Sequence, residues 1–184
     1  MKMFENISQC VKCDLYKNQK PLLDNVSNAD IMWVGLSAKK VSSLFDSIPL
    51  DNNTATGKII EEIETKEFLF YKTNLVKCVP LDQNQKLRYP TTKEMQSCLD
   101  NLIFEILTIK PKLVFLLGTK VSDLVLKQLK SKRIIDKFNN ETIVILEKIQ
   151  FQKIYHPSYI AVYKRKEKHT YVQDVKDIIK NYVK

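Results

Sequence analysis

Short apolar runs alternate with amphipathic stretches along this chain of 184 residues. Two of the runs are continuous and end at a glycine, Gly35 or Gly118, which is typical of strands buried on both faces. Strands are predicted at residues 31–34, 68–74, 113–117 and 141–146. Helical spacing of apolar residues predicts helices at residues 56–66, 91–109, 119–130 and 171–183. This alternation indicates an α/β fold with a largely parallel sheet, in which ligands bind beyond the carboxyl ends of the strands.

The composition is that of one globular domain spanning residues 1–184, with 44% hydrophobic and 28% charged residues. No apolar run approaches the roughly 18–20 residues that a transmembrane helix needs. The N-terminus lacks the apolar stretch of a signal peptide. A cytoplasmic protein with no membrane partner is therefore expected. The net charge of +9 favours a polyanionic partner such as nucleic acid, although solubility alone would also account for it.

The four cysteines are candidates for one metal centre, because disulfides are rare in a reducing compartment. Cys10 and Cys13 form a C-x2-C pair, Cys78 follows a predicted strand, and Cys98 lies about two turns into a predicted helix. Zinc sites usually combine two C-x2-C pairs, so the wide separation of Cys78 and Cys98 favours an iron–sulfur cluster over zinc. Four unrelated core cysteines remain an alternative.

Five strings of residues, in order, resemble motifs of the iron–sulfur uracil-DNA glycosylases, families 4 and 5 of the uracil-DNA glycosylase superfamily. They are CVKCDL at 10–15, TNLVKCVP at 73–80, PTTKEMQSC at 90–98, PKLVFLLG at 111–118 and HPS at 156–158. Together they cover nearly the whole chain and include all four cysteines. The order and number of the matches make the resemblance specific.

The resemblance implies a three-layer α/β/α sandwich around a four-stranded, mainly parallel sheet. It implies a structural [4Fe–4S] cluster on Cys10, Cys13, Cys78 and Cys98, near the surface that binds DNA. The implied activity is that of a monofunctional DNA glycosylase in base-excision repair. Such an enzyme flips a damaged base out of the helix and hydrolyses its N-glycosidic bond, which leaves an abasic site. We expect the protein to act as a monomer.

Carried over to this chain, the family's base-reading asparagine is Asn74, whose amide suits the N3–H and O4 edge of uracil. The HPS histidine is His156, which would stabilise the negative charge on O2 of the departing base. Both are expected to be catalytic. The base pocket is expected to be formed by Gly35, Leu36, Ser37, Leu50 and Asn74. DNA phosphates are expected to contact Ser158, Lys164, Arg165 and Lys166.

The chain departs from the family at the first motif. Family 4 has GEAPG where this chain has GLSAK at residues 35–39, so the acid is missing; family 5, with GLAPA, also lacks it. The aromatic residue that stacks on the base is replaced by Leu50, with Phe45 a possible substitute. Asp51 could hold a water, although Asp-Asn-Asn is also a common loop string.

These departures leave the substrate open. Uracil is the first expectation. The alternatives are another base such as hypoxanthine or a hypermodified pyrimidine, a catalytically silent iron–sulfur protein that binds DNA, and a zinc-binding DNA module. A polar segment at 83–89, with Lys86 and Arg88, is interpreted as a loop near DNA.

Overall fold

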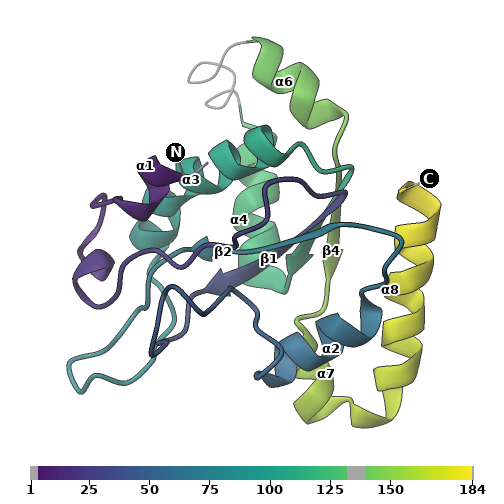
Figure 1. Ribbon diagram of the computed structural model, residues 1–184, viewed down its shortest axis with the longest axis horizontal. Coiled ribbons are helices and arrows are strands. Elements are labelled where there is room, and N and C mark those ends of the chain that lie inside the picture. The colour runs from purple at the N-terminus through teal and green to yellow at the C-terminus, as the bar shows by residue number, and fades with distance from the viewer. Residues whose placement is uncertain (1–3, 132–139, 184) are drawn as a thin grey trace.

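The computed structural model describes residues 4–131 and 140–183 (Figure 1). Within this part of the chain the strands form one parallel sheet in the order β2-β1-β3-β4. The strands are β1 (Ile31–Ser37), β2 (Phe70–Val76), β3 (Leu113–Leu117) and β4 (Gln150–Ile154). The predicted α/β fold with a four-stranded parallel sheet is confirmed.

Helices cover both faces of the sheet, as Figure 1 shows. One side carries α1 (Glu5–Ser8), α3 (Thr92–Ile109), α4 (Thr119–Leu129) and α6 (Asn140–Glu147). The other side carries α2 (Ala55–Ile63), α7 (Pro157–Tyr163) and α8 (Lys168–Tyr182). Two 3-10 turns complete the elements, η1 (Asp14–Lys17) and η2 (Arg165–Glu167). Within the described residues, no helix combines the length and apolarity needed to cross a bilayer.

The strand sequences divide their side chains between the two layers because successive residues of a strand point to opposite faces. Met32 and Val34 of β1 pack with α3 and α4, whereas Ile31 and Trp33 pack with α2. All four side chains are fully buried. A continuous apolar run is thus what a strand between two helical layers requires.

The prediction of a strand at residues 141–146 is wrong, because these residues belong to α6. Ile145 and Leu146 of this helix pack against the core on the α3 side, and such packing outweighs the β propensity of the segment. The edge strand is instead β4. It was not predicted because three of its residues, Gln150, Gln152 and Lys153, are polar and interrupt the apolar run.

Two further corrections concern the ends of strands. Gly35 does not end the first strand, since β1 continues through it to Ser37. The helix α7, directly after the HPS histidine, was not expected; Pro157 begins it at a position that suits proline. The long helix α3 begins as predicted, with Thr91 as its cap and Glu94 completing a capping box.

A buried ion pair joins α3 to the segment after β2. Lys77 and Glu105 are completely inaccessible to solvent and form a salt bridge. Glu105 also accepts hydrogen bonds from the hydroxyls of Tyr71 (2.8 Å) and Thr73 (3.0 Å). The ammonium of Lys77 donates to the backbone oxygen of Asn74 at 2.6 Å. Because a buried charge is costly unless it is fully paired, this network holds β2 and α3 at a fixed separation.

We predict that Glu105→Gln destabilises the protein by about 3–5 kcal/mol, because it leaves the Lys77 ammonium buried without its counter-charge. Denaturant unfolding of wild type and variant would measure the change. The matched control is Glu67→Gln at an exposed residue, which should change the free energy of unfolding by no more than about 0.5 kcal/mol. Equal effects of the two substitutions would contradict the structural role given to the pair.

Candidate active site

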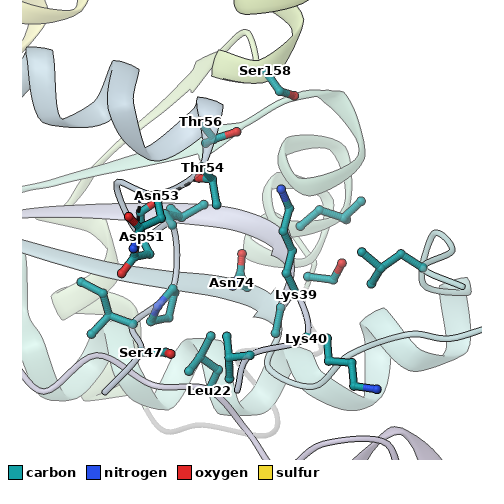
Figure 2. Close-up of a pocket in the computed structure, with 18 of the residues that line it drawn as sticks. Leu22, Lys39, Lys40, Ser47, Asp51, Asn53, Thr54, Thr56, Asn74 and Ser158 are labelled. Atoms are coloured by element: carbon teal, nitrogen blue, oxygen red, sulfur yellow. Dashed lines mark hydrogen bonds between the residues drawn. The ribbon is translucent and has the colours of Figure 1, made fainter. Parts of the chain in front are cut away.

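A cavity of about 810 Å³ opens beyond the carboxyl ends of β1 and β2, where ligands bind in parallel α/β sheets. Its walls are the segment that follows β1, the loop that leads into α2, and the turn between β4 and α7. Figure 2 shows Asn74 at its centre, between the Asp51 loop and Lys39. The cavity therefore brings together segments that are far apart in the sequence.

Asn74 lies on β2 directly beside Gly35 of β1 and is 3% exposed. A side chain at position 35 would collide with Asn74 Oδ1 and would approach Leu50 Cδ2 to 3.0 Å. Glycine at position 35 is thus what allows the amide to lie across β1. Among the described residues this amide has no hydrogen-bond partner, yet it is not sealed from the cavity. Its oxygen and nitrogen are available to a ligand.

His156 also lines the cavity, as the cap of α7. Its Nδ1 accepts hydrogen bonds from the backbone N–H of Ser158 at 3.2 Å and from the Ser158 hydroxyl at 2.8 Å. This arrangement places the ring proton on Nε2. Burial, and secondarily the charge of Lys39, lowers the pKa of His156 below its ordinary value. The ring is therefore neutral at neutral pH.

The pocket residues expected from the sequence are brought together. Leu36, Ser37 and Leu50 line the cavity with Asn74, and Gly35 lies beneath it. Leu50 has a φ of 56°, a left-handed conformation that strains a non-glycine backbone. Its methyl groups are held over Gly35 by this turn. Phe45, the possible aromatic substitute, is 82% exposed and does not line the cavity.

The basic residues expected at DNA are placed less uniformly. Ser158 lines the cavity, but Lys164 forms an ion pair with Glu167 at 2.7 Å. Arg165 and Lys166 lie in η2 and line no part of the cavity. The basic side chains that line it are instead Lys39, Lys40 and Arg88. Arg88 lies in the polar segment that the sequence placed near DNA. Lys39 ends the divergent first motif and Lys40 follows it, and neither was expected at the cavity.

Two acids line the cavity, Asp46 and Asp51, and of these only Asp51 is half-buried. Asp51 Oδ1 accepts a hydrogen bond from the backbone of Asn53 at 2.8 Å, which is the turn that the loop interpretation anticipated. Its other carboxylate oxygen has no hydrogen-bond partner among the described residues. Asp51 therefore lies in a loop turn and also lines the cavity.

The four cysteines lie in one neighbourhood, each with a free thiol. Burial, followed by the charges of Cys98, Cys13 and Cys10, raises the pKa of Cys78 to about 12. The Asn101 amide donates to Cys10 Sγ at 3.3 Å, and the backbone of Lys77 hydrogen-bonds the sulfur of Cys98. In the described part of the chain, no three His, Cys, Asp or Glu side chains converge on one ion.

Comparison with known proteins gives three findings. The sequence model of the Uracil DNA glycosylase superfamily matches residues 19–180. The Type-4 uracil-DNA glycosylase of Archaeoglobus fulgidus is 26% identical over 182 residues, which cover 94% of this chain and 87% of that protein. Wild-type SMUG2 of Pedobacter heparinus is similar in structure, with a TM-score of 0.59 and 18% identity over 86% of this chain and 76% of that one. At this identity the structural likeness shows the fold.

Proposed function

The chain belongs to the uracil-DNA glycosylase superfamily, and from this premise we propose that it excises uracil from DNA and leaves an abasic site. The observation that carries the proposal is the pairing of two groups across one cavity. The Asn74 amide has no hydrogen-bond partner among the described residues and is open to the cavity, and His156 is held with its proton on Nε2. One group suits recognition of a base, and the other suits stabilisation of a leaving anion.

The reaction follows from the chemistry of these groups. The Asn74 amide donates to O4 and accepts from N3–H of a flipped uracil. As the bond to the sugar breaks, negative charge gathers on the base, and the Nε2–H of His156 donates to O2. A neutral imidazole with a fixed tautomer can donate there at neutral pH without itself carrying a charge. Water then attacks the cationic sugar.

Asp51 is the acid that the cavity offers for orienting that water. Its half-buried carboxylate keeps one oxygen without a protein partner among the described residues. Asp51 would orient the water in place of a carboxylate in the first motif, because residues 35–39 contain no acid.

A related activity on a larger base is the second candidate, favoured by two observations. The cavity of about 810 Å³ exceeds the size of one pyrimidine, and Leu50 gives the base no aromatic surface on which to stack. Hypoxanthine or a hypermodified pyrimidine could therefore be accepted as well as uracil.

We predict that the protein releases uracil from a single-lesion oligonucleotide. Asn74→Ala and His156→Ala should each slow single-turnover release by about 10²–10⁴-fold. Chromatography of the free base, followed by alkaline cleavage of the abasic strand, would measure both products. Asn181→Ala and His169→Ala, at exposed residues of the same types, are the matched controls and should retain the wild-type rate.

The same assay with hypoxanthine and modified pyrimidines tests the second candidate. Release of another base with uracil untouched would overturn uracil as the substrate. Rates that are indistinguishable in all four variants would contradict the assigned site. No release of any base by the wild type would favour a catalytically silent DNA-binding protein.

The cofactor we propose is a [4Fe–4S] cluster on Cys10, Cys13, Cys78 and Cys98. Two of the thiols are buried, and hydrogen bonds reach the sulfurs of Cys10 and Cys98, as is common around iron–sulfur clusters. The wide separation of Cys78 and Cys98 in the sequence suits a cluster better than a zinc ion, because zinc sites usually combine two C-x2-C pairs. When bound, the cluster would supply a cross-link between the N-terminal segment, β2 and α3.

We predict about four iron and four sulfide per chain after anaerobic purification, with visible absorption that Cys98→Ser abolishes. Ser97→Ala, one residue away on the same helix, should keep both the iron and the absorption. Metal analysis by mass spectrometry would give the counts. A colourless protein that carries one zinc would contradict the cluster and support the zinc-binding alternative.

A further inference from the structure

A row of exposed tyrosines lies next to the active-site cavity, and the proposed chemistry makes no use of it. Tyr155, Tyr159 and Tyr163 follow one another at intervals of four residues, so the last two lie on one face of α7. The ring centroids of Tyr155 and Tyr159 are 5.7 Å apart, and those of Tyr159 and Tyr163 are 5.3 Å apart. The rings remain 62%, 41% and 76% exposed.

The tyrosines line a second cleft, which we call the tyrosine groove, with a volume of about 520 Å³. Tyr89 and Val162 complete its apolar wall, and both are more than half exposed. Leu36, His156 and Ser158 line both the groove and the active-site cavity. The groove therefore continues from the place where a flipped nucleotide would be bound.

Lys120 lines the groove, and Lys164, which also pairs with Glu167 at 2.7 Å, lies beside it. The ammonium of Lys120 lies 3.8 Å from the centre of the Tyr89 ring, and that of Lys164 lies 5.8 Å from the centre of the Tyr155 ring. No acidic side chain is among the residues that line the groove. The backbone at Tyr155 is also held in place, because the Tyr171 hydroxyl of α8 donates to the backbone oxygen of Tyr155 at 2.7 Å.

We infer that the tyrosine groove binds single-stranded DNA beside the target nucleotide, with unpaired bases stacked on Tyr155, Tyr159 and Tyr163 and phosphates near Lys120 and Lys164. Successive aromatic rings beside lysines are how proteins bind single strands without reading their sequence. Bases in an intact duplex are already stacked on one another, so the groove distinguishes a single strand from a duplex. The inference rests on the proposed function for the position of the target nucleotide.

The test is fluorescence anisotropy with a labelled thymidine oligomer that contains no uracil, and with a duplex of the same length. We expect Tyr163→Ala to weaken binding of the single strand by about tenfold and to leave duplex binding within twofold. Tyr163→Phe keeps the ring and should bind as wild type does. Tyr182→Ala, at an exposed tyrosine near the end of α8, is the matched control and should also bind normally.

A second variant tests the charged part of the groove independently. Lys120→Ala should reduce the salt dependence of single-strand binding, by about 0.7 in the slope of log K against log salt concentration. Tyr163→Ala should leave that slope unchanged, because stacking releases no counterions.

Several outcomes would overturn the inference. These are unchanged single-strand binding by Tyr163→Ala, equal weakening of single strand and duplex, or a change confined to oligomeric state on size exclusion, which would mark a protein interface. Binding to an undamaged strand does not depend on excision. If wild type binds as expected but releases no base, the proposed function fails while the groove stands. If wild type releases uracil but Tyr163→Ala binds the single strand as wild type does, the inference about the groove fails while the proposed function stands.

Discussion

The ion pair between Lys77 and Glu105 is the interaction on which the site depends, because both charges are fully buried and neither can be left unpaired. Lys77 also donates to the backbone of Asn74 and directly precedes Cys78. Glu105 lies two turns beyond Cys98 on α3. One pair thus fixes the spacing between the residue proposed to read the base and two of the proposed cluster ligands, so the cluster scaffold and the pocket floor form one structure.

Above this floor, the missing side chain at Gly35 decides what the pocket can hold. Asn74 can extend across β1 only because position 35 has no Cβ, and Leu50 closes over both in a strained turn. The divergent residues begin immediately after this glycine. The geometry thus leaves the Asn74 amide free for the base recognition proposed for it, while residues 36–39 supply no carboxylate.

The sequence was sufficient to predict helices and strands where the local pattern and the tertiary packing agree. The buried strands β1 and β3 are continuous apolar runs, and α3 begins at a capping box, so both the sheet centre and the main helix were predictable. It failed at the edge of the sheet, where β4 is half polar and α6 is rich in β-branched residues. The tyrosine groove was missed because an interval of four residues carries meaning only once α7 is known to be a helix. The ion pair of Lys164 with Glu167 likewise depends on a turn, η2, that the charge pattern does not specify.

A crystal structure with DNA tests the central claim most directly. The oligonucleotide would carry 2′-fluoro-2′-deoxyuridine, whose fluorine slows glycosidic cleavage by withdrawing electrons from the sugar. The account predicts that uracil lies in the cavity with its N3–H and O4 edge hydrogen-bonded to the Asn74 amide and its O2 facing His156 Nε2. A base that stays stacked in the DNA, or that enters elsewhere with Asn74 untouched, would contradict it.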